Sequence, residues 1–207
     1  MKKIMVLIVV LAFVFTSSLM SQGLGFGAKA GLNMAKFTGD DASYEDTNPK
    51  FKLGGTFGGF ITMPLGDKLT IRPEVLFTQK GAKYKESEEG VEFSETMKMN
   101  WLDIPILAVY QVANGISAFI GPYFDLYLGG EAVFKIEGDG MSIEGDEKIE
   151  GEDVNSLGFG LIFGGAYSLT NNIEVEARVA LGLTSFDEEC TIKNMGIQVI
   201  ANYYLRK

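Results

Sequence analysis

Eight charged residues, spread through the chain, are the strongest candidates for chemistry. Three are basic and five are acidic: Lys29, Arg72, Glu74, Asp103, Asp125, Glu174, Glu176 and Arg178. Several stand two residues apart, a spacing that places side chains on the same face of a β-strand. Gathered in one interior, they could pair with one another or conduct protons or ions. Because unpaired buried charges are costly, we expect a network of buried ion pairs, with a conducting path as the alternative.

The remaining composition excludes most catalytic centres. The chain has no histidine and one cysteine, Cys190. It therefore cannot build a Ser–His or Cys–His hydrolase, a cysteine-rich metal site or an internal disulfide. The oxygen-rich segment 137–153 lacks the spacing of an EF-hand and is expected to be a solvated loop. Weak bridging of divalent ions to lipopolysaccharide is its alternative role. We predict no enzyme activity, no catalytic residue, no cofactor and no metal site.

The first residues are typical of a secretory signal peptide. Lys2 and Lys3 precede an unbroken apolar run over residues 4–15, and small and polar residues follow. Twelve apolar residues are short for a membrane-spanning helix, which needs about 20. We predict a signal peptide over residues 1–21, cleaved after Ser21, and a single domain over residues 22–207.

The elements that must position the charged residues are β-strands. Apolar and polar residues alternate with a period of two in eight stretches, and no segment after the signal predicts a helix. One face of the seventh stretch, for example, carries Ile173, Val175 and Ala177, and the other carries Glu174 and Glu176. The eight stretches are residues 24–36, 51–63, 69–83, 96–112, 117–134, 154–168, 173–186 and 194–205.

The connections between these strands alternate between two kinds. Three are tight, at Pro64–Lys68, Ala113–Gly115 and Thr170–Asn172, and are typical of hairpin turns. Four are longer and contain 20 of the 27 acidic residues: 38–50, 84–96, 135–153 and 187–193. This pattern predicts an all-β fold, an eight-stranded antiparallel up-and-down barrel with both termini at the short-turn end.

Alternation alone does not decide which face points outward. In a soluble lipocalin-like barrel the apolar face lines a ligand cavity, whereas in an outer-membrane barrel it faces lipid. The polar face here is rich in glycine, including Gly27, Gly31, Gly58 and Gly164. A narrow lumen needs such small residues between a few large ones, whereas a solvated face does not. We therefore predict a transmembrane barrel, with the soluble ligand-binding barrel as an alternative.

Three of the predicted strands resemble those of the PorT-like outer-membrane barrels of Bacteroidota. The similar segments are Gly27–Asn33, Ile71–Gly81 and the Trp-Leu-Asp-Ile-Pro-Ile-Leu motif of Trp101–Leu107. The resemblance covers the whole predicted domain and implies an eight-stranded barrel inserted by the outer-membrane assembly machinery. It implies no single activity, although one family member is tied to type IX secretion. The ending Tyr203–Lys207 differs from the terminal aromatic residue that is common in proteobacterial porins.

Together these features predict a monomeric barrel in the bacterial outer membrane, with its long acidic loops extracellular and its termini periplasmic. An eight-stranded lumen is just wide enough for side chains, which favours a plugged barrel with a structural or surface-interaction role. The alternative is a channel for small solutes or ions. Expected partners are outer-membrane lipid, lipopolysaccharide and other envelope or secretion proteins. A net charge of −9 argues against nucleic acid.

Overall fold

The computed structural model describes most of the chain. The described residues are 23–43, 47–88, 91–138, 141–151, 154–186 and 190–206. The expected signal peptide, residues 1–21, lies outside them. No helix in these ranges is long and apolar enough to cross a lipid bilayer.

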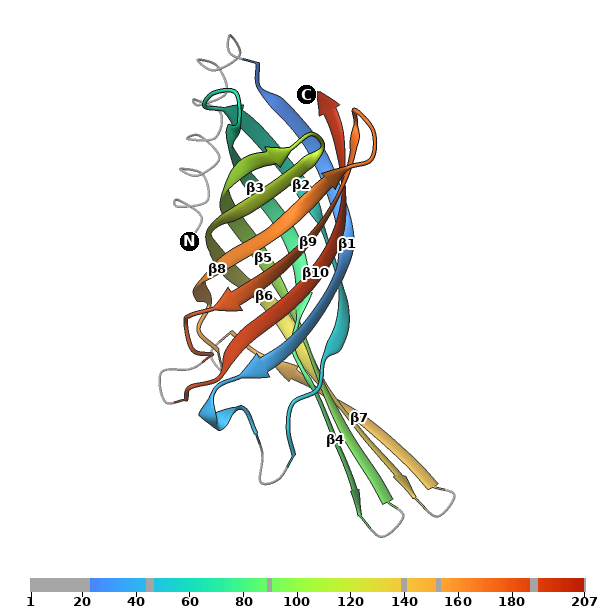
Figure 1. The fold of residues 1–207 in the computed structure, drawn as a ribbon. Helices are drawn as coiled ribbons and strands as arrows, with labels where there is room; N and C mark the ends of the chain where they lie inside the picture. The colour runs from blue at the N-terminus through green and yellow to red at the C-terminus, as the bar shows by residue number, and fades with distance from the viewer. Residues whose placement is uncertain are drawn as a thin grey trace.

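Eight antiparallel strands close into a barrel, which confirms the predicted fold (Figure 1). Each strand pairs with its neighbours in the ring, and β1 closes it by pairing with β10. The alternating, β-branched and aromatic residues of these segments favour strands. In ring order they are β1 (Gly25–Thr38), β2 (Lys52–Pro64), β3 (Leu69–Lys80), β5 (Val91–Ala113), β6 (Ile116–Gly138), β8 (Leu157–Ser168), β9 (Ile173–Gly182) and β10 (Lys193–Arg206).

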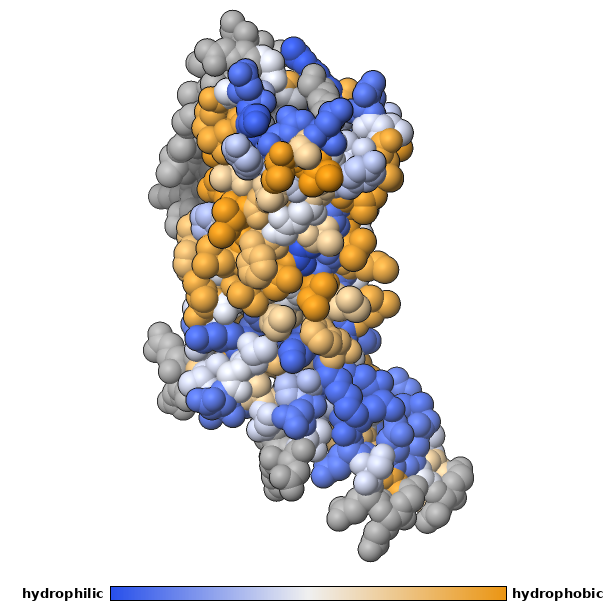
Figure 2. All heavy atoms as spheres, viewed as in Figure 1, coloured by the Kyte–Doolittle hydropathy of each residue, from blue (hydrophilic) through white to orange (hydrophobic). Residues whose placement is uncertain are grey.

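The barrel is inverted relative to a soluble protein. Along β9, Ile173 is exposed on the outer surface, whereas Glu174, Glu176 and Arg178 are buried inside. On the face that Figure 2 shows, apolar side chains form a band across the barrel between more hydrophilic ends, and each ring strand carries exposed apolar residues. The band is the surface expected of a barrel in lipid. The soluble ligand-binding alternative is therefore wrong, because it requires the apolar face of the strands to line the interior, whereas here that face is the exposed one.

Two of the predicted loops are instead β-structure. The segment 84–96 contains β4 (Lys83–Glu88) and the first residues of β5, and 135–153 contains the end of β6 and β7 (Met141–Ile149). Strands β4, β5, β6 and β7 form a four-stranded sheet that projects beyond the barrel (Figure 1). We call this sheet, residues 83–98 and 131–149, the extension. High acidity suggested loops, but cross-strand pairing satisfies the backbone here.

The two ends of the barrel are built differently. At the short-turn end, tight turns such as the one closed by Leu65 N–H and Leu69 C=O join the strands. At the long-loop end, a short 3₁₀ helix, Asp40–Ala42, buries Ala42. An apolar cluster from several sides of the barrel packs beneath it and includes Phe37, Ala42, Ala82, Tyr84, Met99, Trp101 and Val154. This cluster covers the long-loop end of the lumen.

Candidate functional site

The lumen brings the eight sequence-predicted residues into two clusters. Six of them, from β1, β3 and β9, form the central cluster: Lys29, Arg72, Glu74, Glu174, Glu176 and Arg178. The other two, Asp103 and Asp125, lie directly opposite each other on β5 and β6 and form part of a second cluster. The alternation of each strand directs all eight side chains inward, and the closure of the barrel makes them neighbours.

Glu74 is the centre of the first cluster. Its Oε1 accepts a hydrogen bond from Lys29 Nζ at 2.6 Å and lies 3.0 Å from Arg72 Nε. Its Oε2 accepts a hydrogen bond from Arg178 Nη1 at 2.7 Å. All three cations therefore converge on one carboxylate whose side chain is fully buried.

The other two glutamates extend the cluster along β9. Glu176 accepts from Lys29 Nζ at 2.9 Å and from Arg72 Nη2 at 2.7 Å. Glu174 accepts from Arg72 Nη1 at 3.0 Å. The Asn202 amide on β10 donates to both carboxylates, at 2.9 and 3.0 Å. Arg72 thus holds three carboxylates at once, a geometry that suits its planar, multi-donor guanidinium.

The central cluster is electrically balanced. Three basic and three acidic side chains are almost completely buried, and each acid contacts at least one cation. Such balance matters because a buried charge without a partner costs several kcal/mol. The cluster fills the lumen and ties β1, β3 and β9 together through contacts that cross the barrel.

The second cluster contains a residue that was missed in the sequence. Lys80 lies 2.8 Å from Asp103 Oδ1 and donates to Asp125 Oδ2 at 2.6 Å. Its ammonium also lies over the rings of Trp101 and Tyr123, at 5.3 and 4.9 Å from their centroids. Lys80 continues the even-numbered inward series of β3, and that alternation is the signal that could have identified it.

A glycine gives the second cluster its space. A Cβ atom built on Gly158 would lie 1.8 Å from Asp125 Oδ1, so no other residue fits there without displacing the carboxylate. Gly158 is opposite Asp125 in the β6–β8 register. This contact explains one glycine of the polar face in terms of the large charged side chain beside it.

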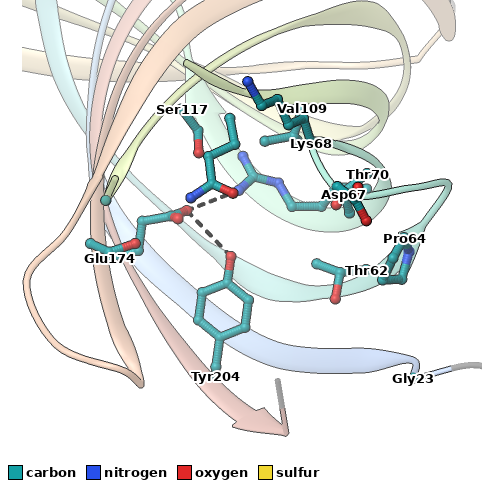
Figure 3. A pocket seen from close by; sticks show the side chains of 14 residues that line it. Gly23, Thr62, Pro64, Asp67, Lys68, Thr70, Val109, Ser117, Glu174 and Tyr204 are labelled. Atoms are coloured by element: carbon teal, nitrogen blue, oxygen red, sulfur yellow. Dashed lines mark hydrogen bonds and ion pairs between the residues drawn. The ribbon is translucent and has the colours of Figure 1, made fainter. Parts of the chain in front are cut away.

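A polar cavity of about 210 Å³ opens at the short-turn end (Figure 3). Arg72, Glu174 and Tyr204 of the lumen are among its lining residues, and Tyr204 OH donates to Glu174 Oε1 at 3.4 Å. Lys68 and Asp67, from the turn between β2 and β3, also line it. The cavity lets solvent reach the central cluster from this side, and the cluster itself fills the lumen beyond it.

A clasp outside the barrel wall holds the 3₁₀ helix in place. Asp41 Oδ2 accepts hydrogen bonds from the backbone N–H of Thr191 at 2.8 Å and from its hydroxyl at 2.9 Å. These two bonds favour the ionised carboxylate and lower the pKa of Asp41 below its usual value. The clasp joins the 38–50 segment to the segment before β10.

Comparisons with known proteins agree with this architecture. The family described as outer membrane protein beta-barrel domain matches residues 17–188. No curated protein sequence matches the chain. Among solved structures, Neisserial surface protein A is 12% identical, with a TM-score of 0.51, covering 88% of this chain and 99% of its own. The attachment invasion locus protein Ail of Yersinia pestis is 13% identical, with a TM-score of 0.47, covering 89% and 99%.

At 12% identity the likeness to Neisserial surface protein A shows the fold alone. The family match spans most of the chain, and the apolar outer band and charged interior are those of a barrel in lipid. The chain therefore belongs to the outer membrane protein beta-barrel domain family and is an integral outer-membrane β-barrel protein.

Proposed function

We propose that this protein is a plugged barrel that displays its extension at the cell surface and has a structural or surface-interaction role. The observation that carries this proposal is the filled lumen. The six charged side chains of the central cluster are at most 7% exposed and are held by ion pairs that cross the barrel. Within the described part of the chain, side chains fixed in this way fill the lumen at their level, which argues against passage of solutes, and they are poorly suited to release a proton or an ion.

The proposed orientation places the long loops and the extension outside the cell and both termini in the periplasm. It is supported by the general rule that outer-membrane barrels have short periplasmic turns and long extracellular loops. The described chain ends lie at the end opposite the extension (Figure 1). We further propose a monomer that contacts lipid and lipopolysaccharide, is inserted by the outer-membrane assembly machinery, and has envelope proteins as partners.

We also propose that the chain is a PorT-like member of the family, exported by a signal peptide cleaved after Ser21. The support is the resemblance of segments on three ring strands, β1, β3 and β5, to that group. We propose no enzyme activity, because the buried carboxylates are committed to ion pairs. The absence of histidine also removes the usual general base.

Two measurements test the proposal. In planar bilayers, the purified protein is expected to give no sustained conductance, and stable single-channel steps would favour the transport alternative. For orientation, single cysteines are introduced into a Cys190→Ser background. A membrane-impermeant maleimide should label Ser142→Cys on β7 in intact cells. The matched variant Thr170→Cys, on a short turn, should react only after lysis, and the reverse pattern would overturn the orientation.

A further inference from the structure

The extension has two unlike faces. One cross-strand row places Phe93, Ile136 and Ile143 side by side on β5, β6 and β7. Met141 is on the same face, and these side chains are exposed, Met141 by 70% and Ile143 by 63%. The opposite face carries charged pairs such as Lys98 with Glu131. An apolar stripe of this kind, left open beyond the barrel, is typical of a binding surface.

The two outer edges of the extension also differ. Strand β4 is short and carries Lys83 and Lys85. Lys83, its first residue, forms an isolated β-bridge with Lys50. Lysines on a short strand are a common protection of a sheet edge. Strand β7 is nine residues long and carries three acids and one base. Among the described residues, only β6 pairs with β7, so one of its edges has no strand beside it.

We propose that β7 binds an extended peptide segment of a partner protein, which adds to the sheet as an antiparallel strand. The partner segment alternates apolar residues with basic ones. Its apolar side chains continue the row that ends at Ile143, and its basic side chains lie opposite Glu144 and Asp146. Backbone hydrogen bonds to the open edge give affinity, and the two faces give specificity. This inference rests on the proposed display of the extension at the cell surface.

The charge of β7 argues against a second copy of this chain as the partner. Antiparallel pairing of two β7 strands centred on Gly145 places Glu144 of one copy opposite Asp146 of the other, twice. In-register parallel pairing places each acid beside the same acid of the other copy. Like charges directly opposite each other destabilise a strand pair. A partner with basic residues removes this repulsion and replaces it with attraction.

Gly145 adds a size preference. A Cβ atom built there would meet no other atom within 4 Å, so the apolar face has an open place at the middle of β7. Its cross-strand neighbour on β6 is Phe134. A bulky apolar residue of the partner, opposite Gly145, would cover this gap and contact the apolar row.

A designed peptide tests the proposal. The nine-residue probe, capped at both ends, is Ile-Glu-Val-Lys-Phe-Lys-Val-Thr-Ile, which places phenylalanine opposite Gly145 and lysines opposite Glu144 and Asp146. Its binding to the full protein in detergent is measured by fluorescence anisotropy. We expect saturable binding that weakens at least about tenfold when both lysines of the probe become glutamate. The same loss is expected when alternate backbone amides are N-methylated.

Variants of the protein locate the site. The double change Glu144→Lys and Asp146→Lys should weaken binding at least about tenfold, and glutamates in the probe should then restore it. The matched change Glu86→Lys, on β4, should leave binding unchanged. No binding of the probe, equal binding of the N-methylated form, or equal effects at both edges would overturn the proposal. If Ser142→Cys is still labelled on intact cells, the surface display stands and only this inference fails.

Discussion

Replacing Glu74 by glutamine tests the charge balance of the central cluster directly. Glutamine keeps nearly the same shape but removes the negative charge on which Lys29, Arg72 and Arg178 converge. The cluster would then contain three cations and two carboxylates in a fully buried site. The backbone and the outer surface of β3 are unchanged, so the loss can be attributed to the charge.

The expected cost follows from the burial. Removing one partner from a buried ion pair destabilises proteins by about 3–5 kcal/mol, because the other charge is left uncompensated. Since about 1.4 kcal/mol corresponds to a factor of ten, the unfolding constant should rise by roughly a hundredfold or more. A second change, Lys29→Met, restores neutrality with two cations and two carboxylates. The double variant should therefore be more stable than the sum of the single effects predicts, by about 1 kcal/mol or more.

The assay is urea unfolding in lipid vesicles, followed by the fluorescence of Trp101. This residue is the single tryptophan of the chain, and it is buried near the long-loop end of the lumen. The exposed Glu86→Gln is the control and should cost almost nothing. The reasoning is refuted if Glu74→Gln changes the free energy of unfolding by less than about 1 kcal/mol, or if the double variant is strictly additive.

Three further outcomes are expected. Gly158→Ala should destabilise the barrel by about 1–3 kcal/mol in the same assay, since the new methyl group overlaps Asp125 Oδ1. Phe57→Arg places a cation on the apolar outer band near the middle of β2 and should cost about 2–4 kcal/mol in vesicles. The clasp between Asp41 and Thr191 should depend on pH. Because the pKa of Asp41 is lowered, its stabilisation is complete above the ordinary carboxyl range and is lost as pH falls through the lowered value. The exchange rate of the Thr191 amide hydrogen, measured as a function of pH in the unchanged protein and in Asp41→Asn, tests this dependence.

Each of these outcomes has a contrary result. For Gly158, the control is Gly165→Ala, where a Cβ atom would meet only one atom, at 3.5 Å, and equal costs would contradict the overlap argument. For Phe57, a leucine at the same position is the control, and similar stability of the arginine variant would contradict a lipid-facing side chain. For Asp41, a difference from Asp41→Asn that persists at the lowest pH would contradict the clasp.

The ring strands could be predicted because each keeps its alternation over ten or more residues. The series Glu174, Glu176 and Arg178 against Ile173 and Val175 is unambiguous, and its register sets which side chains share the lumen. The sequence also allowed us to predict that the outer surface faces lipid rather than water, because the polar face is rich in glycine. The contact between Gly158 and Asp125 illustrates why those glycines are there.

Two features were harder to predict. Acidic residues are common in loops, so the sequence predicts loops where the extension forms, yet its apolar residues alternate with those acids and pair in a row across β5, β6 and β7. Lys80 follows the even-numbered inward series of β3, but its partners Asp103 and Asp125 lie on β5 and β6 and cannot be identified from β3 alone. Which cation meets which carboxylate depends on distances across the barrel, between residues about 100 positions apart such as Arg72 and Glu176. Such long-range pairings cannot be predicted from a local sequence pattern.

The seam between β1 and β10 governs when the barrel can close. Ala30 pairs with Ala201 and Lys36 with Met195, so the closing contacts join residues far apart in the chain. Until β10 has been synthesised and delivered, β1 has no partner on one side and the sheet remains an open ribbon with its polar face accessible. Lys29 and Glu176 lie on the two sides of β10, on β1 and β9. Their ion pair therefore belongs to the last stage of assembly, and water can hydrate both charges until then.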